Sequence, residues 1–154
     1  MRQPYTVLVF PFRTTAGMPE YALFQRADDS HWQSVAGGVE EGEDLESAAR
    51  REFAEETGLP TVGPLFKLDM VSGVEKSCFA VSKLWPENVY IVPKHFFACD
   101  VTREKAQIVL SSEHRDTQWL QYQAAYESLR YDDDKTALWE LDQRIHRGDL
   151  PGAP

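Results

Sequence analysis

The sequence lacks any long hydrophobic run. Nowhere in its 154 residues is there a stretch of about 18 uninterrupted apolar residues, the length that a membrane-spanning helix needs. The opening segment MRQPYTVLVF has neither the long apolar run nor the small-residue cleavage site of a secretory signal peptide. We therefore expect no membrane partner and a cytoplasmic location.

Cysteine is scarce as well. Cys78 and Cys99 form no CxxC pair and belong to no Cys/His cluster with metal-ligand spacing. Both are flanked by strand-like sequence, so we interpret them as core thiols of a cytoplasmic protein, with a disulfide as the alternative.

Basic residues are outnumbered, with 16 Lys and Arg against 25 Asp and Glu, which gives a net charge of -9. This balance argues against binding a nucleic acid polymer, because that binding needs a cationic surface that releases counterions. Residues 37–59 alone hold eight acids and two bases, a net charge of -6. An anionic substrate would therefore need a cation between itself and this segment.

Apolar material is sufficient for a core, since 42% of the residues are hydrophobic and 12% are aromatic. The sequence shows no internal repeat, low-complexity tract or linker. One α+β domain over residues 1–154 is the economical prediction.

Strand-like segments are short, β-branched or aromatic, and bounded by turn residues. Residues 5–13 and 20–26 predict a hairpin. Further strands are expected at 65–71, 77–82, 88–92, 95–101 and 117–120.

The clearest helix is predicted from Asp44 to Thr57, with Asp44 as N-cap, Gly58 as the C-terminal stop and Pro60 beyond it. The segment Ala36-Gly37-Gly38 before it is predicted to form a glycine-rich turn. Two late helices are expected. The first covers residues 122–130, and the second begins at Asp134, aligns Leu138, Leu141 and Ile145 on one face and stops at Gly148. The tail DLPGAP is expected to be loose.

The acids of the first helix are placed unusually. Glu52, Glu55 and Glu56 are related as i, i+3 and i+4 and lie close to the apolar stripe rather than opposite it. Gathered like charges cost free energy unless a cation joins them, and Mg²⁺ or Mn²⁺ prefers carboxylate oxygens. A glycine loop would also bring a backbone carbonyl close to the ion. The alternative is an ordinary solvated helix rich in Glu and Arg.

The whole segment GGVEEGEDLESAARREFAEETGL resembles the Nudix box, in which a glycine and a glutamate precede Arg-Glu-apolar-any-Glu-Glu-any-Gly-apolar. The matching positions are Gly37, Glu43, Arg51, Glu52, Phe53, Glu55, Glu56, Gly58 and Leu59. Every fixed position is filled, although Phe53 stands where the family more often has an aliphatic residue. The resemblance implies the Nudix fold, a mixed β-sheet sandwiched between α-helices.

The same resemblance implies roles. Glu55 and Glu56 would be metal ligands, the Gly37 carbonyl would assist, and Glu52 would be a ligand or the general base. Glu43 and Arg51 would form a buried structural pair that holds loop to helix. The reaction would be hydrolysis of a diphosphate bond in a small polyphosphate, assisted by Mg²⁺ or Mn²⁺.

Family members often recruit a further acid from a loop before a late strand. Glu113 in LSSEHRDTQWL occupies the matching place and is predicted to be a fourth ligand or the base itself; as the alternative, it caps a turn. The adjacent His114 is a candidate phosphate contact, although a lone histidine is more often structural.

Two stretches, RADDSHWQSVAGGVEEGE and SSEHRDTQWL, are similar to the dihydroneopterin triphosphate pyrophosphatase branch of the family, in folate biosynthesis. This similarity implies that Arg26, Trp32 and Gln33 lie near the substrate. Trp32 or Trp85 would stack on a planar ring, with core or rim packing as the alternative for each.

Other functions stay open at this stage. Hydrolases of diadenosine polyphosphates or of damaged nucleoside triphosphates use the same box. A non-catalytic ligand sensor is a further alternative, but the box carboxylates are all present and no basic DNA-binding appendage is visible. A monomer and a homodimer are both compatible with the sequence.

Overall fold

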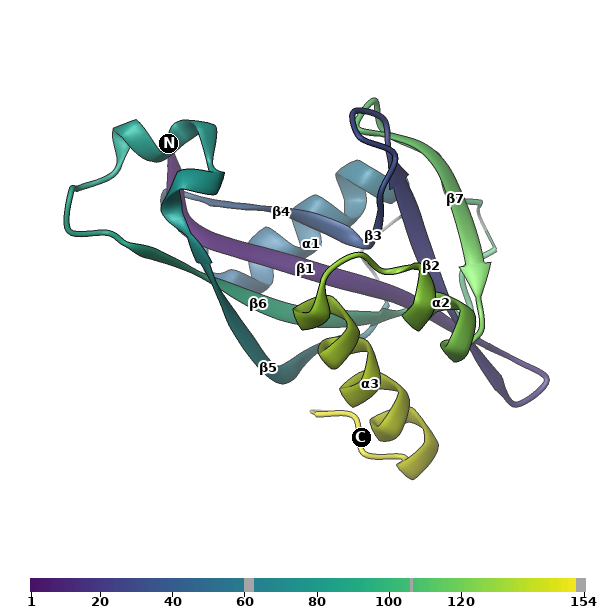
Figure 1. The fold of residues 1–154 in the computed structure, drawn as a ribbon. Coiled ribbons are helices and arrows are strands. Elements are labelled where there is room, and N and C mark those ends of the chain that lie inside the picture. The colour runs from purple at the N-terminus through teal and green to yellow at the C-terminus, as the bar shows by residue number, and fades with distance from the viewer. Residues whose placement is uncertain (60–62, 106, 152–154) are drawn as a thin grey trace.

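A computed structural model describes residues 1–59, 63–105 and 107–151 (Figure 1). Its strands are β1 (Arg2–Thr15), β2 (Met18–Arg26), β3 (Trp32–Gln33), β4 (Val35–Glu40), β5 (Leu65–Glu75), β6 (Ile91–Asp100) and β7 (His114–Leu120). Its α-helices are α1 (Leu45–Thr57), α2 (Tyr122–Ser128) and α3 (Asp132–Arg147).

The strands form a mixed sheet built around β1. One edge of β1 pairs in parallel with β6, and the other edge pairs antiparallel, first with β4 and then with β2. Strand β2 extends beyond β1 to pair with β3 and β7, and β5 pairs with β6. This arrangement places β4, which carries the glycines, beside the N-terminal half of β1.

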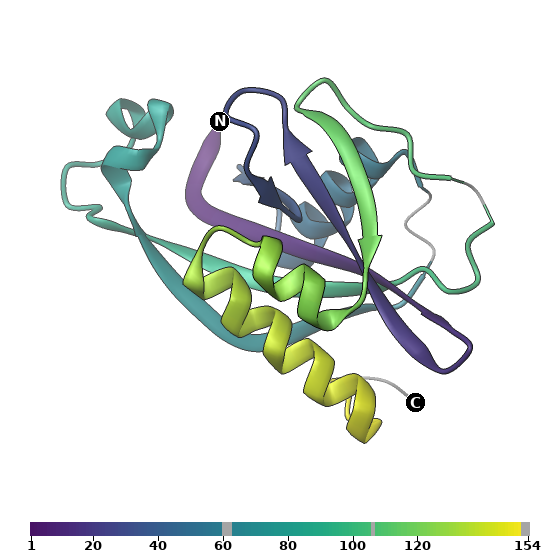
Figure 2. The ribbon, with the colours of Figure 1, turned by 45° about the vertical axis from the view of Figure 1, so that its right-hand side comes forward.

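Helices cover both faces of the sheet, α1 on one face and α2 with α3 on the other (Figures 1 and 2). Because successive strand residues point to opposite faces, Val7 and Val9 of β1 pack in the cluster that contains Phe53 of α1. Leu8 and Phe10 pack in the cluster that contains residues of α2 and α3. The predicted α+β sandwich of a mixed sheet between helices is therefore confirmed.

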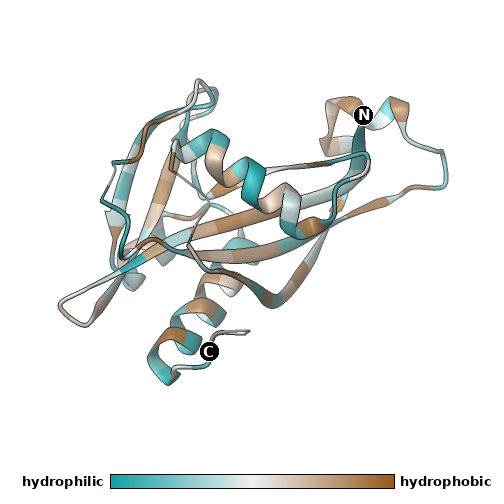
Figure 3. Ribbon diagram, turned by 180° about the vertical axis from the view of Figure 1, so that it is seen from behind, coloured by the Kyte–Doolittle hydropathy of each residue, from teal (hydrophilic) through white to brown (hydrophobic). Residues whose placement is uncertain are grey.

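Helix α1 has the predicted boundaries and caps. The Asp44 side chain accepts a hydrogen bond from the Ser47 backbone N–H at 2.7 Å, which satisfies a free donor of the first turn. Gly58 ends the helix with a left-handed φ of 67°, and its N–H donates to the Ala54 carbonyl. Pro60, predicted to follow, lies outside the described residues. Figure 3 shows α1 lying across the hydrophobic strands with hydrophilic residues on its turns.

The predicted glycine-rich turn is wrong. Ala36, Gly37 and Gly38 lie inside strand β4 and are paired antiparallel with β1. The hairpin at 5–13 and 20–26 is confirmed as β1 and β2, and the segments at 65–71 and 117–120 lie in β5 and β7. The strand expected at 95–101 lies in β6, which begins at Ile91 and takes in only the last two residues of the strand expected at 88–92.

The strand predicted at 77–82 is also wrong. Two 3₁₀ turns occupy this region, at Lys76–Cys78 and Ala80–Leu84. Here Phe79 packs on Trp85 with ring centroids 5.6 Å apart, and the Trp85 indole N–H donates to the Arg2 carbonyl at 2.8 Å. The aromatic side chains therefore fold back onto the start of β1 instead of extending along a strand.

The late helices differ little from prediction. Helix α2 ends at Ser128, and α3 begins at Asp132, two residues before the predicted start at Asp134. Leu138 and Leu141 are buried as expected, and Ile145 packs partly buried against the same cluster. Leu150 of the tail also packs against this cluster, so the tail is not loose there. Residues 152–154 lie outside the described part of the chain.

The two cysteines differ in exposure. Cys99 is a buried core thiol as predicted, whereas Cys78 is exposed, which corrects the prediction of two core thiols. Cys78 lies in a 3₁₀ turn rather than in the expected strand, so its side chain has no sheet face to pack against. Both are free.

Among the helices of the described chain, none combines the length and apolar character that crossing a bilayer requires.

Candidate active site

The Glu52 carboxylate lies against the backbone of Gly37. A Cβ atom added to Gly37 would overlap the Glu52 carboxylate, so the glycine provides the space in which this side chain lies. Gly37 is therefore needed for the close approach of α1 to β4 rather than for a turn. Burial raises the pKa of Glu52, and this rise is opposed by Arg51.

Glu56, one turn further along α1, is almost completely buried, with 2% of the residue exposed. Across the part of the chain that the structure describes, neither of its carboxylate oxygens has a hydrogen-bond partner. Burial raises its pKa to about 9. The Glu113 side chain and the charge of Glu52 act in the same direction, and the Ala36 backbone N–H opposes them. An ionised, unpaired carboxylate in this position is costly without a counter-charge.

Glu55 is the exposed member of the group, with 57% of its side chain accessible. The Arg51 guanidinium stands between it and Glu52, because Nη1 of Arg51 lies 2.9 Å from Glu52 Oε1 and 3.5 Å from Glu55 Oε2. Glu52 and Glu55 therefore share one guanidinium, as their i, i+3 spacing allows, whereas Glu56 lies buried apart from it. In this structure Arg51 supplies the neutralising charge for Glu52 and Glu55.

Arg51 also has the predicted contact with Glu43. Its Nε and Nη2 atoms donate to the two Glu43 oxygens at 2.8 and 2.9 Å, and Nη2 donates to the Gly38 carbonyl at 2.8 Å. This bidentate bond lowers the pKa of Glu43 to about 2. The pair is not buried as expected, because 30% of the Arg51 side chain and 20% of the Glu43 side chain are exposed. The contact ties the loop after β4 to the helix.

Glu113 comes to this site from a segment distant from α1 in the sequence. It immediately precedes β7, and its carbonyl accepts a hydrogen bond from the Ala27 N–H at 2.9 Å, which anchors the loop beside the end of β2. Its exposed carboxylate lies near enough to Glu56 and Glu52 to raise the pKa of both. The structure therefore brings Glu113 together with the acids of α1.

His114, a candidate phosphate contact or a structural histidine by its sequence, is buried at the site. It is buried beneath Glu56, and its Nδ1 atom lies 3.9 Å from Oε2 of Glu56. Its other ring nitrogen lies 3.1 Å from Nε2 of Gln33, and its ring packs on Phe24. Burial lowers the pKa of His114. The available sequence signal was its position next to Glu113 at the start of a late strand.

The three predicted substrate residues are not gathered at one point. Gln33 is buried and contacts His114, whereas Trp32 packs partly buried against the core cluster under α2 and α3. Adjacent strand residues point to opposite faces, so the sheet separates these two side chains. The Arg26 guanidinium is engaged by Asp28 at 2.7 and 2.9 Å.

Trp85 does not offer a free face near the carboxylates, since it is buried, packs on Phe79 and donates to the Arg2 carbonyl. Arg2 itself packs over Gly38 on the strand that carries Gly37. Burial lowers the pKa of Arg2, opposed by Glu52 and Glu40. Core packing is thus the role that the contacts of Trp85 support.

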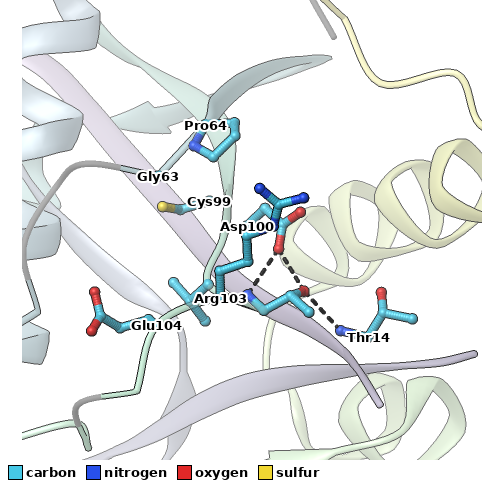
Figure 4. A pocket seen from close by; sticks show the side chains of 9 residues that line it. Thr14, Gly63, Pro64, Cys99, Asp100, Arg103 and Glu104 are labelled. Atoms are coloured by element: carbon cyan, nitrogen blue, oxygen red, sulfur yellow. Dashed lines mark hydrogen bonds between the residues drawn. The ribbon is translucent and has the colours of Figure 1, made fainter. Parts of the chain in front are cut away.

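A cavity of about 650 Å³ lies elsewhere, near the C-terminal ends of β1 and β6 (Figure 4). Asp100 in its lining accepts hydrogen bonds from the backbone N–H and the hydroxyl of Thr102, and the Thr102 hydroxyl accepts one from the Thr14 N–H. None of its lining residues comes from α1 or β4, so it is distinct from the carboxylate site.

The chemistry of the donor set fits a hard divalent cation. The buried Glu56 oxygens lack partners, and carboxylate oxygens are the ligands that Mg²⁺ prefers. Within the residues described, however, no three His, Cys, Asp or Glu side chains are already arranged as a metal cluster. The contacts of Arg51 with Glu52 and Glu55 account for part of this, because they hold those carboxylates to a guanidinium.

A helix that carries carboxylates over a mixed sheet, with Gly37 beneath Glu52, defines a Nudix-type site. The family model of the NUDIX domain matches residues 2–140. The chain therefore belongs to the Nudix hydrolase family.

Individual relatives agree with this. A solved structure of a Nudix-family protein from Listeria monocytogenes superposes with a TM-score of 0.89 at 34% identity, covering 98% of this chain and 100% of that one. The dihydroneopterin triphosphate diphosphatase of Escherichia coli is 32% identical over 127 residues, which are 80% of this chain and 82% of that enzyme. An RNA pyrophosphohydrolase of Caulobacter vibrioides is 60% identical over 38 residues, and this match spans only 22% of that protein.

Proposed function

We propose that this Nudix hydrolase cleaves a diphosphate bond in a nucleoside- or pterin-type polyphosphate, with Mg²⁺ or Mn²⁺ as the cofactor. Glu52, Glu55, Glu56 and the Gly37 carbonyl are the proposed metal ligands. The observation that carries the proposal is the buried Glu56, whose oxygens have no hydrogen-bond partner among the described residues and whose neighbours Glu52 and Glu113 are also acids. A divalent cation is the partner that this arrangement needs.

When bound, the divalent ion would neutralise phosphate oxygens and acidify a bound water. The residues of the chain have separate tasks. Gly37 gives Glu52 room against the sheet, and the bond from Arg51 to Glu43 fixes the loop that precedes α1. Glu113 or Glu52 is proposed to accept the proton of the attacking water, because either carboxylate lies beside Glu56 at the site. One water is consumed and two phosphate-bearing fragments are released.

Dihydroneopterin triphosphate is the substrate that we put first, which would place the enzyme in folate biosynthesis. Support comes from the 32% identity over four fifths of the chain to the E. coli dihydroneopterin triphosphate diphosphatase. An RNA pyrophosphohydrolase of Sphingopyxis alaskensis also matches, at 32% identity over 120 residues, so identity does not separate the two substrate classes. The net charge of -9 is the observation that disfavours an RNA substrate, because binding a nucleic acid polymer needs a cationic surface. Arg26 and Trp32 remain the proposed substrate contacts, whereas the buried Gln33 contacts His114 instead. The small molecule is the proposed partner rather than a nucleic acid polymer or a membrane.

A substrate panel tests the proposal. The protein is assayed with Mg²⁺ on dihydroneopterin triphosphate, diadenosine tetraphosphate and an oxidised purine nucleoside triphosphate, and released pyrophosphate is distinguished from orthophosphate. We expect metal-dependent hydrolysis that EDTA abolishes, fastest on the pterin. Preference for diadenosine tetraphosphate or the oxidised nucleotide would reject the pterin assignment only. Absence of hydrolysis on every member, with tight binding of one, would favour the sensor alternative over the enzyme.

A further inference from the structure

His114 sits directly beneath the proposed metal ligand Glu56. The histidine side chain is fully buried, and its Nδ1 atom has no hydrogen-bond partner among the described residues. Both Glu56 oxygens are likewise unpartnered, and one of them is 3.9 Å from this nitrogen. Buried polar atoms are nearly always paired, so unpaired atoms that face each other indicate a contact with a function.

The other side of the imidazole ring determines which nitrogen carries the proton. The Nε2 atom of His114 lies 3.1 Å from Nε2 of Gln33, and an amide nitrogen is always a donor. With the Gln33 amide oriented as it is in this structure, the ring nitrogen that faces it accepts the hydrogen bond. A neutral imidazole has one N–H, so the proton is on Nδ1, the atom that faces Glu56.

We propose that His114 is a positioning residue that directs its Nδ1–H toward Glu56 and holds that carboxyl group in the orientation that metal ligation needs, with Gln33 fixing the tautomer. The inference rests on the proposed function for the identity of the metal site. Ligating carboxylates are commonly held by such hydrogen bonds, and loss of one typically weakens metal affinity 10- to 100-fold.

The distance is consistent with this role. At 3.9 Å the contact is about 1 Å longer than a hydrogen bond, and a small rotation of the Glu56 side chain would close it. Gln33, also buried, is then better explained as the residue that orients His114 than as a direct substrate contact.

The tautomer is measurable on the intact, metal-free protein. With ¹⁵N-labelled histidine, long-range ¹H–¹⁵N spectra distinguish a protonated from an unprotonated ring nitrogen. We expect a neutral His114 ring with the proton on Nδ1. Protonation on Nε2 would overturn the proposal, because the Gln33 amide would then be reversed and Glu56 would face a lone pair.

Two variants test the metal side of the inference. His114→Asn places an amide N–H near the position of Nδ1, whereas His114→Gln places one near Nε2, and both lose the ring packing on Phe24. In Mn²⁺ titrations followed by calorimetry, we expect His114→Gln to bind about 10- to 100-fold more weakly and His114→Asn to stay within about threefold of wild type. Equal losses in both variants would show that the ring only packs.

Failure of the proposed function would look different. Wild type that binds no Mn²⁺ would reject the metal site, and the positioning role with it. Wild type that binds Mn²⁺ but hydrolyses no member of the substrate panel would reject the substrate class and leave the metal-binding result for His114 in support of the inference.

Discussion

The carboxylate of Glu52 occupies the space that a Cβ atom on Gly37 would fill. This relationship joins the helix of the Nudix box to the strand that begins the box. It explains a glycine whose backbone conformation is an ordinary strand conformation, and it makes Gly37 a test of where the Glu52 carboxylate must lie.

Gly37→Ala should therefore displace the Glu52 carboxylate and lower kcat on the order of 10²-fold. The cost in stability should be below about 1 kcal/mol, because the displaced group is the end of a flexible side chain. Gly38→Ala is the matched control, since its Cβ would meet Arg2 instead. Steady-state kinetics and thermal unfolding measure the two effects. An equal kinetic loss in both variants would mean that the strand, and not Glu52, is disturbed.

Glu55→Gln and Glu56→Gln should each reduce turnover by on the order of 10² or more, because each removes a proposed metal ligand while preserving side-chain shape. Mg²⁺ titrations of activity should show that added metal does not restore either variant fully. Near-normal metal-dependent activity in both would refute the ligand assignment. Circular dichroism of each variant provides the control for folding.

Glu56 should also make the metal-free protein less stable as the pH rises. Its folded pKa is raised from 4.5 to about 9, mainly by burial, so the folded state binds this proton more tightly than the unfolded state does. The stabilisation is full below the unfolded pKa and is lost as the pH rises through the folded pKa. In EDTA, the melting temperature of wild type should therefore fall between about pH 5 and pH 9 relative to Glu56→Gln. Melting temperatures that change with pH in parallel for the two proteins would contradict this. Added Mg²⁺ should reduce the difference between their melting temperatures.

The bond between Arg51 and Glu43 should contribute to stability more than to chemistry. Because the pair is partly exposed, Glu43→Gln should cost about 1–2 kcal/mol in the free energy of unfolding rather than the larger amount expected of a buried pair. Arg51→Ala should cost at least as much, since it also loses the bond to the Gly38 carbonyl. Urea unfolding measures both. Unchanged stability of Arg51→Ala together with abolished turnover would assign Arg51 a catalytic role instead.

Trp32 is predicted to affect substrate selection. Trp32→Leu keeps apolar packing but removes the ring, so it should raise KM for the pterin roughly 2- to 10-fold and narrow the difference between pterin and purine triphosphates. Trp85→Leu is the control, because the buried Trp85 packs on Phe79 and bonds to Arg2 of β1 rather than offering a free face. A fall in kcat alone, equal on both substrate types, would leave support of the sheet as the role of Trp32.

The sequence by itself determined the helix that carries the site. Cap residues and the 3.6-residue period act within the helix, so the caps at Asp44 and Gly58 and the burial of Glu56 on the side of Phe53 follow from local spacing. Strands β1 and β2 were equally readable, because their apolar runs are bounded by turn residues.

Only the tertiary structure decided what surrounds that helix. Glu113 and His114 meet Glu56 because β7 pairs with β2, a contact between segments about 90 residues apart that no local pattern encodes. Pairing with β1 likewise makes Gly37 part of a strand, and strand alternation sends Trp32 and Gln33 to opposite faces. Local propensity selects the elements, but burial and strand pairing across the sequence select which of their side chains share a site.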